Sequence, residues 1–180
     1  MTRVAIQGIS GSYSEEAVRK LFGDEATVVE CHDFAATFAA VRGGDADSAV
    51  VPIENKIVGQ IGGASDLLRI GKFTVLDKLP LPVRHVLAGA PGSKFEDLVS
   101  VRSHVEALRQ CQRFLASTPH LTPIVGADTA SSIRRIVSEK DPTHAAIGSR
   151  RAAKFYGAEV LRENIADDSD NWTIFYLIGN

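Results

Sequence analysis

The sequence predicts an α/β protein made of two lobes with a central cleft. Short apolar segments of strand type alternate with amphipathic helical segments along most of the 180 residues. This alternation is typical of parallel strands that helices cover on both faces. It is interrupted once, near the middle, by extended segments, and then begins again. A chain of this length can form two small lobes that share a cleft.

The first α/β series lies at the amino terminus. Val4-Ala5-Ile6 is predicted to be a buried strand, followed by a loop over residues 8–14 and a helix over 15–22. A strand at 27–30, a helix from about 34 to 41 and a strand at 49–51 complete this series. We expect Pro52 to end the third strand, because proline has no amide hydrogen to give to a ladder.

The middle of the chain has a different pattern. Two β-like runs, residues 73–76 and 83–88, lie on either side of a bend marked by Pro80 and Pro82. A second series then follows, with strands near 98–101, 123–125 and 145–147 and helices over 104–115 and 129–138. In the first of these helices the apolar residues recur at steps of three or four, which predicts a core-facing stripe.

These patterns give predicted lobe boundaries. Residues 1–76 plus 168–180 form the first lobe, because we expect the final apolar run, residues 173–178, to return to it. Residues 77–167 form the second lobe. No internal repeat connects the two series, so their shared plan is inferred from structure type alone.

Composition excludes several classes of protein. The 20 basic and 22 acidic residues give a net charge of −2, which does not favour nucleic acid or an acidic membrane as a partner. The short basic runs Arg134-Arg135 and Arg150-Arg151 are interpreted as solvated helix faces. No segment approaches the ~20 apolar residues of a membrane span, and the start lacks a signal-peptide pattern. Two cysteines without metal-ligand spacing favour a reduced, cytoplasmic setting and no metal site.

Four predicted strand-to-helix junctions are rich in Gly, Ser and Thr, and helix N-termini there point N–H groups at ligands. They are residues 8–15, residues 52–56 with the glycines behind them, Ser103-His104, and residues 128–132. Each alone has a structural explanation, since Ser14 and Ser103 are ordinary N-cap residues and glycines serve turns. Together, and without a Walker lysine, they predict a site for a small anion.

Other catalytic motifs are absent. Gly8-Ile9-Ser10-Gly11 lacks the middle glycine of the dinucleotide fingerprint. Gly148-Ser149-Arg150 lacks the second glycine of a nucleophile elbow. A triad of Ser103, His104 and Asp128 is disfavoured, because adjacent side chains at one helix start diverge.

The junctions and the carboxyl-terminal segment together resemble the prephenate dehydratases and the plant arogenate dehydratases. The resemblance covers residues 4 to about 178 in order. Its main motifs are residues 4–8 with 11–15, Val51-Pro52-Ile53-Glu54-Asn55 with Gly59, Ser103-His104, Asp128-Thr129-Ala130, residues 145–147, and residues 167–175, which are similar to an Asn-x-Thr-Arg-Phe signature. The two-lobed plan also resembles the type II periplasmic-binding-protein-like fold.

The resemblance implies an enzyme that converts prephenate to phenylpyruvate by loss of water and carbon dioxide, in phenylalanine biosynthesis. It assigns to Thr173 the role of general acid, with Asn171 beside it and Glu54 and Asn55 shaping the cleft floor. The remaining expected substrate-binding residues offer hydroxyl, N–H or ring contacts: Ser12, Ser103, His104, Thr129, Ala130, Ser131 and Phe175. Aromatisation drives the reaction, so we expect no cofactor. Similar enzymes associate, so a homo-oligomer is expected.

The sequence departs from the family in two places. The signature arginine is replaced by Ile174, which removes five donors and a fixed charge. Members usually continue into a domain that binds phenylalanine, so from the end at Asn180 we expect neither that domain nor an effect of phenylalanine. Three alternatives remain open: arogenate as substrate, a prephenate decarboxylase that forms no aromatic ring, and a non-catalytic module that binds a small anion.

Overall fold

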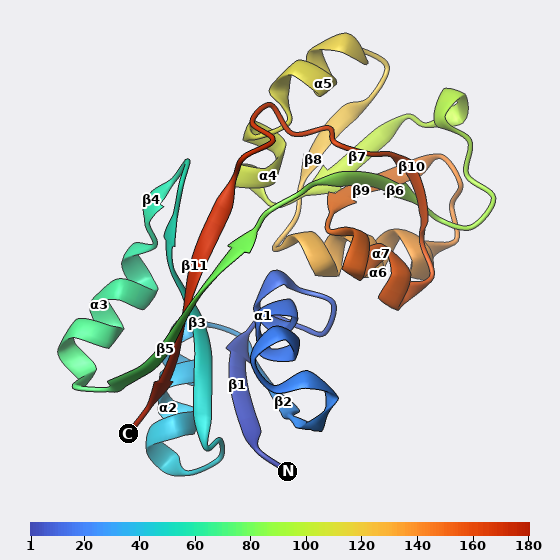
Figure 1. Cartoon of the computed structure of the whole chain (residues 1–180). Coiled ribbons are helices and arrows are strands. Elements are labelled where there is room, and N and C mark those ends of the chain that lie inside the picture. Colours follow the sequence, from blue (N-terminus) through green and yellow to red (C-terminus); the bar gives the residue numbers. More distant parts are fainter. The chain divides into compact units, whose positions relative to one another are not determined.

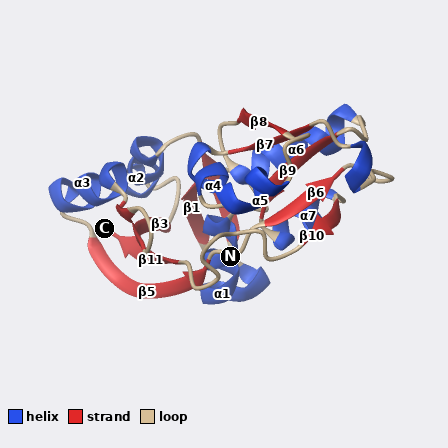
Figure 2. Ribbon diagram, turned by 90° about the horizontal axis from the view of Figure 1, so that it is seen from above, coloured by secondary structure: helices blue, strands red, loops and turns tan.

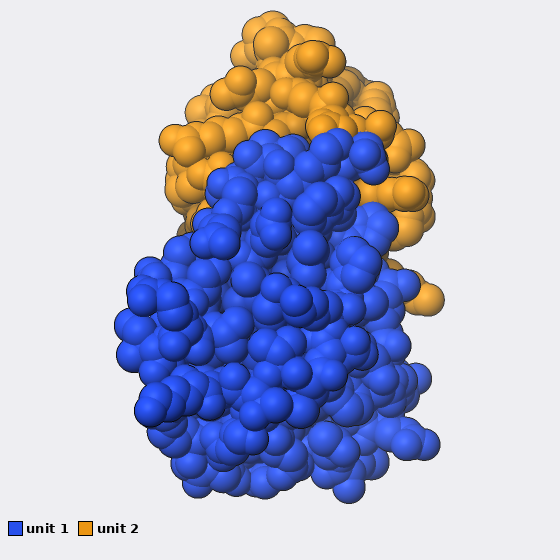
Figure 3. Space-filling model, turned by 60° about the vertical axis from the view of Figure 1, so that its left-hand side comes forward, with its two compact units in different colours: residues 1–83, 170–180 blue, residues 84–169 orange.

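The computed structural model describes residues 1–180, and the chain divides into two compact units (Figure 3). The first unit is Met1–Val83 with Asp170–Asn180, and the second is Arg84–Ser169. The chain therefore passes from the first unit to the second after Val83, where the prediction was after residue 76. It returns to the first unit at Asp170, where the prediction was 168. No helix is both long and apolar enough to span a membrane.

The first unit is built on one mixed sheet (Figure 1). Its strands are β1 (Arg3–Gln7), β2 (Thr27–Cys31), β3 (Ser48–Asn55), β4 (Gly59–Gln60), β5 (Thr74–Pro82) and β11 (Trp172–Gly179). The order is β2-β1-β3-β11-β5, with β4 paired to β3. The first three strands are parallel, while β11 runs antiparallel to both β3 and β5. The carboxyl-terminal run thus returns to the first unit as predicted.

Helices cover both faces of this sheet. They are α1 (Tyr13–Phe22), α2 (Phe34–Gly43) and α3 (Gly62–Gly71), with a 3-10 turn, η1 (Gly23–Glu25). Residues of α1 form one core with Val4, Ile6, Leu81 and Phe175, whereas α2 and α3 form the other with Ala5, Val51 and Ile178. Figure 2 shows α1 across the strands from α2 and α3. Helix α3 was not predicted, because it begins with two glycines and lacks a side-chain cap.

Two prolines that were predicted to mark a bend lie inside β5 instead. This strand continues through Pro80 and Pro82 because it is the edge of the sheet and pairs with β11 alone. Residues two apart present their backbone nitrogens to the same side, so both missing amide hydrogens face away from the ladder. The same reasoning corrects the prediction that Pro52 ends β3. Strand β1 pairs with Ser48–Val50 only, so Pro52 has no ladder partner to lose on that side.

The second unit has a five-stranded sheet of order β10-β6-β9-β7-β8. Its strands are β6 (Val86–Gly89), β7 (Ser100–Ser103), β8 (Thr122–Val125), β9 (His144–Gly148) and β10 (Glu159–Arg162). Strand β7 is parallel to β8 and β9, and β6 is antiparallel to β9 and β10. The helices are η2 (Phe95–Asp97), α4 (Val105–Arg109), α5 (Gln112–Ser117), α6 (Thr129–Glu139) and α7 (Arg150–Tyr156).

The predicted helix over residues 104–115 is broken into α4 and α5. At the break, the N–H of Asp167 donates to the Gln110 carbonyl (2.7 Å) and the Asp167 carboxylate accepts from the N–H of Arg113 (3.0 Å). A distant loop therefore takes hydrogen bonds that a continuous helix would have made within itself. The predicted stripe still packs, because Leu108 and Cys111 lie in the core of this unit with Leu115 against it.

Candidate functional site

The first unit contains a buried polar network centred on Asn55, at the end of β3. The two hydrogens on its side-chain Nδ2 are shared among three acceptors: the Asn171 Oδ1 (3.0 Å), the Trp172 carbonyl (2.9 Å) and the Thr173 Oγ1 (3.0 Å). Its Oδ1 accepts from the N–H groups of Ile57 and Val58, both at 3.0 Å. The surrounding donors and acceptors leave one orientation for this amide. Every hydrogen-bonding position of the Asn55 side chain is thus used within the protein.

The network controls the hydroxyl of Thr173. Asn55 and Thr173 are directly opposed in β3 and β11, and both are at least nine-tenths buried. Because the Thr173 oxygen accepts from Asn55, its own proton is free to point away from the amide. An N–H bond to that oxygen also stabilises the negative charge that forms if the proton leaves. The Thr173 oxygen accepts from an amide N–H, which cannot act as a base, so this contact leaves the hydroxyl proton available for donation.

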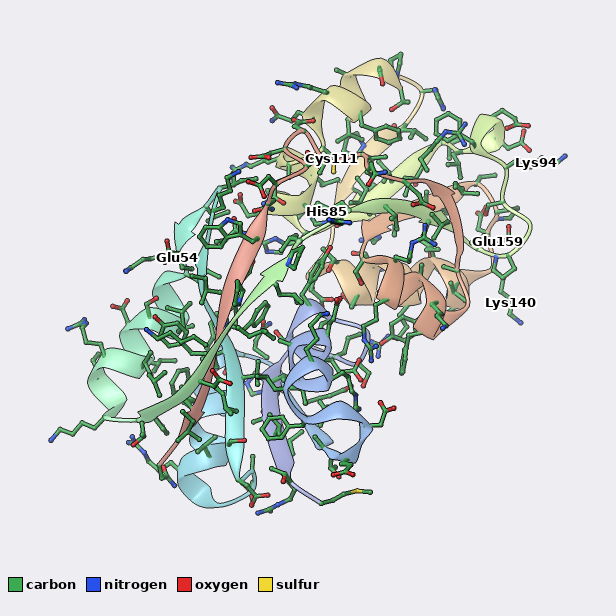
Figure 4. All side chains as sticks on the ribbon, viewed as in Figure 1. Glu54, His85, Lys94, Cys111, Lys140 and Glu159 are labelled. Carbon is green, nitrogen blue, oxygen red and sulfur yellow. The ribbon has the colours of Figure 1, made fainter.

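Alternation along the strands separates Glu54 from this network. Glu54 and Ile174 oppose each other across β3 and β11, one residue before Asn55 and one after Thr173. Successive side chains in a strand point to opposite faces, so these two lie on the other face of the sheet. Glu54 is exposed there (Figure 4). The structure therefore does not bring the Glu54 and Asn55 side chains together, and the expectation that Glu54 shapes the cleft floor stays a prediction; Ile174 lies on the face opposite Thr173.

Phe175 lies in the hydrophobic core and not at a position that could contact a ligand. Its side chain is 2% exposed and packs with Val4, Val18 and Leu81 in the core beside α1. A ring held in this way supports the sheet and has no surface to offer a ligand. The register shifts between Ile174 and Phe175, where β3 carries one extra residue, Ile53, between their partners Glu54 and Pro52.

Ser12 begins α1 at the carboxyl end of β1. Its Oγ accepts from the N–H of Glu15 (3.2 Å), so Ser12, not the expected Ser14, is the N-cap. The loop before it is held by two carboxylates: Glu15 accepts from the Gly11 N–H (2.7 Å), and Glu30 from the N–H and hydroxyl of Ser10 (both 2.6 Å). Since its oxygen accepts, the Ser12 hydroxyl keeps its proton for donation. These positioning carboxylates were not found from the sequence, although a Ser12–Glu15 capping box was readable there.

In the second unit, Ser103 and His104 have different surroundings from those predicted. Ser103 is fully buried, and its hydroxyl donates to the Ile147 carbonyl across to β9 (2.7 Å). Its hydroxyl hydrogen is therefore used within the second unit, and its expected contact with a ligand stays a prediction. His104 is the N-cap of α4, where its Nδ1 accepts from the Glu106 N–H at 3.3 Å. With Nδ1 as acceptor, the neutral ring carries its proton on Nε2, which can donate.

Helix α6 brings together the last group of predicted residues. Asp128 caps it by accepting from the Ser131 N–H (2.7 Å), and the Ser131 hydroxyl donates to the Asp128 carbonyl (3.3 Å). Both Ser131 donors are thus used within the helix, and its expected contact with a substrate carboxylate stays a prediction. The N–H groups of Thr129 and Ala130 precede the first intrahelical bond, and the Thr129 hydroxyl is half-exposed. Ala130 is buried, so it can contribute only its N–H.

An ion pair next to the network was missed by the sequence analysis. The Lys56 Nζ lies 3.1 Å from the Asp170 Oδ2, and the Lys56 N–H donates to the Trp172 carbonyl (3.0 Å). These contacts join the end of β3 to the start of β11. The only available signal was that each residue adjoins a motif asparagine.

Burial shifts the pKa of three further titratable groups. Burial lowers the pKa of His85, whose Nε2 donates to the Gln110 Oε1 at 2.9 Å (Figure 4). Burial, with Asp167 nearby, raises the pKa of Cys111 to about 12, and burial also raises that of Cys31. Both cysteines are free thiols. No group of three or more His, Cys, Asp or Glu side chains gathers to hold a metal ion.

Comparison with known proteins decides the family. The family model described as prephenate dehydratase matches residues 4–180. The chain belongs to the prephenate dehydratase family. The chloroplastic arogenate dehydratase/prephenate dehydratase 1 of Arabidopsis thaliana is 41% identical over 176 residues, which are 98% of this chain and 44% of that protein. This chain therefore spans less than half the length of that relative.

Solved structures give the same family and fold. A prephenate dehydratase from Arthrobacter aurescens in complex with L-Phe is 29% identical with a TM-score of 0.91, over all of this chain and 60% of that one. A protein described as a quorum quenching acylase, GqqA, is 31% identical with a TM-score of 0.87, over 99% and 64%. A periplasmic substrate-binding protein from Coxiella burnetii, 11% identical with a TM-score of 0.50, covers 98% of this chain and 84% of that one and shares the fold alone. The predicted fold class and family are confirmed.

Proposed function

We propose that this chain catalyses the decarboxylating dehydration of prephenate to phenylpyruvate, with Thr173 as the general acid. The observation that carries the proposal is the hydrogen bond from Asn55 to the Thr173 oxygen, inside a network that Asn171 and Trp172 complete. A threonine hydroxyl is a weak acid. It becomes a useful donor when its proton is directed outward and its oxygen is already stabilised by an N–H.

The proposed step balances within the substrate. The bond between the ring and its carboxylate breaks, and its electron pair enters the ring as the carbon–oxygen bond of the ring hydroxyl breaks. Carbon dioxide leaves, the departing hydroxide takes the Thr173 proton to become water, and the ring becomes aromatic. Asn55 holds the resulting alkoxide until solvent returns a proton to it. The balance needs no external oxidant or reductant, which supports the expectation that no cofactor takes part.

The substrate's two carboxylates require donors that are not already used. In the first unit, the Ser12 hydroxyl retains its proton, and it lies on the α1 face of the sheet, which is also the face of Thr173. Taken by itself, the second unit offers as unused donors the N–H groups of Thr129 and Ala130, the Thr129 hydroxyl and the Nε2–H of His104. All are neutral donors, which suit carboxylates at a helix N-terminus.

Arogenate is a second candidate substrate, because the 41% identical relative carries both names. Arogenate has an ammonium group in place of the keto group of prephenate, and the same loss of water and carbon dioxide follows. The acylase activity named for GqqA is not favoured here, because Thr173 accepts from an amide and no base activates it.

One assay compares these activities. Purified protein is incubated with prephenate, with arogenate or with an acylated amine, and the products are identified by chromatography. Phenylpyruvate from prephenate supports the proposal, and phenylalanine from arogenate at a higher kcat/KM would make arogenate the substrate. Carbon dioxide without an aromatic product would instead establish a decarboxylase. Substrate binding without turnover of any of them would establish a binding module and reject the enzyme.

Setting and assembly are also proposals. The two free thiols support a reducing, cytoplasmic compartment, although the Arabidopsis relative is named as chloroplastic. A homo-oligomer is proposed from the family resemblance, with light scattering coupled to size exclusion as its test. A single species of 19.3 kDa would contradict it.

A further inference from the structure

Two neighbouring arginines and a third from a distant part of the sequence line one hollow in the second unit. Its volume is about 330 Å³, and its lining residues are Arg102, Gly126, Ala127, Ser131, Ser132, Arg134, Arg135 and Ser138. This pocket is called the arginine hollow. No acidic side chain lines it. It shares only Ser131 with the residues expected at the candidate site.

Two elements build the arginine hollow. On α6, the adjacent Arg134 and Arg135 each lie three or four positions from Ser131 and from Ser138, so the four side chains share one side of the helix. Arg102 comes from β7, where Val101 and Ser103 are buried and Arg102 is half-buried. The pair Arg134-Arg135 by itself suggests only a solvated helix face. Tertiary folding adds a third guanidinium, that of Arg102, and this addition favours a binding site over a solvated helix face.

A glycine keeps the hollow open. A Cβ at Gly126 would lie 2.5 Å from the Ser132 oxygen and 3.2 Å from the Arg102 Cγ. The contact with Ser132 is shorter than real Cβ atoms show, so a side chain at position 126 would force Ser132 to shift and would press on Arg102.

Charge in the hollow is poorly balanced. Arg135 pairs with Glu139 of the same helix at 2.6 Å, on the exposed surface. Arg102 and Arg134 have no carboxylate partner. Like charges gathered around one space repel one another, and an anion there would offset that repulsion. Guanidinium groups also present paired N–H donors that match phosphate and carboxylate oxygens.

The serines add a second requirement to the ligand. Ser131 and Ser132 donate to the Asp128 carbonyl (3.3 and 2.6 Å), and Ser138 donates to the Arg135 carbonyl (2.8 Å). Their protons are therefore directed into the helix, and their oxygens can only accept from a ligand. The hollow consequently matches an anion that also carries hydroxyl or amine hydrogens.

We propose that the arginine hollow binds a small dianion, either a phosphoryl group or a pair of carboxylates, as a site separate from the Thr173 network. A volume of about 330 Å³ lies at the lower end of small-molecule pockets and admits a metabolite but not a polymer. The proposal does not depend on the enzymatic activity, because binding is measured without substrate.

The test is calorimetric titration of the full chain at constant ionic strength with inorganic phosphate, with a sugar phosphate and with succinate. Arg102→Gln and Arg134→Gln should each weaken binding at least tenfold. The exposed Arg69→Gln, on α3 of the first unit, is the matched control and should bind as the unsubstituted protein does. The three titrants distinguish phosphoryl from dicarboxylate ligands. Circular dichroism of each variant establishes that it is folded.

Two results would overturn the proposal. One is no binding of any titrant up to about 20 mM, where even a millimolar site would be mostly filled. The other is binding that the arginine variants leave unchanged while Thr129→Ala abolishes it. That second result would place the anion at the helix N-terminus instead. Loss of binding in the arginine variants with retention in Thr129→Ala would establish the site.

Discussion

Replacing Thr173 by valine should separate catalysis from stability. Valine keeps the shape and branching of threonine and removes only the hydroxyl. After the change, the two Nδ2 hydrogens of Asn55 still have two acceptors, the Asn171 Oδ1 and the Trp172 carbonyl. No buried polar group loses all its partners, so the free energy of unfolding should change by less than about 1 kcal/mol.

The kinetic effect should be much larger. A positioned general acid typically contributes ~10²- to 10⁴-fold in rate, which corresponds to about 2.7 to 5.5 kcal/mol of activation free energy. We therefore expect kcat to fall by at least about a hundredfold with little change in KM, because the lost bond forms to the leaving oxygen in the transition state. Phenylpyruvate formation from prephenate gives both constants, and urea unfolding gives the stability.

Thr173→Ser is the matched control, since it keeps the hydroxyl and should retain most of the turnover. Near-normal kcat in Thr173→Val would refute the reasoning, because the role depends on the oxygen alone. A large fall in stability would refute the account of the network, even if the activity also disappeared.

Three other changes test the surrounding structure. Asn55→Ala removes the donor to Thr173 and the acceptor of the Ile57 and Val58 N–H groups. We expect the free energy of unfolding, measured by urea titration, to fall by about 1 to 3 kcal/mol. We also expect a lower kcat. Equal stability of this variant would contradict the network. Ile174→Arg should form a cross-strand ion pair with Glu54 and change the free energy of unfolding by no more than about 1 kcal/mol. We expect kcat to stay within about threefold, because both residues lie on the face of the sheet opposite Thr173. A tenfold change in kcat would show that residues on that face influence the reaction. Since burial lowers the pKa of His85, the unfolded state binds its proton first as pH falls below about 6.5, and stability should be lost from there towards the lower pKa of the folded state. The melting temperature of His85→Gln should fall less between pH 7.5 and 5.5, as scanning calorimetry can establish; parallel curves would exclude His85 as the cause.

Local pattern predicted most of the elements in this protein. The strands β1, β2 and β9 and the helices α1, α2 and α6 lie close to their predicted ranges, because their apolar spacing matches one secondary structure. The segments that were predicted wrongly are those whose local sequence pattern was outweighed by their position in the fold. Helix α3 starts at glycines, and β5 contains two prolines that only an edge strand accepts.

The candidate site was predicted unevenly. Thr173, Asn171 and Asn55 were singled out and are joined by hydrogen bonds. Ser103, Ser131 and Phe175 were also singled out, but their polar hydrogens or ring are used inside the protein. A motif shows that a residue type is present at a loop or strand. It does not show whether that residue's hydrogen-bonding capacity is already taken by a neighbour.

The sequence by itself determined the alternating α/β order, the family and the short list of polar residues, because these depend on spacing and residue type. The tertiary structure alone decided which side chains share a face. Asn55 and Thr173 are 118 positions apart, and only the register of β3 and β11 sets them together and turns Glu54 and Ile174 away. The same holds for Arg102 and Arg134. Pairing between distant strands and helices has no local signal, since it arises when separate apolar faces are buried together.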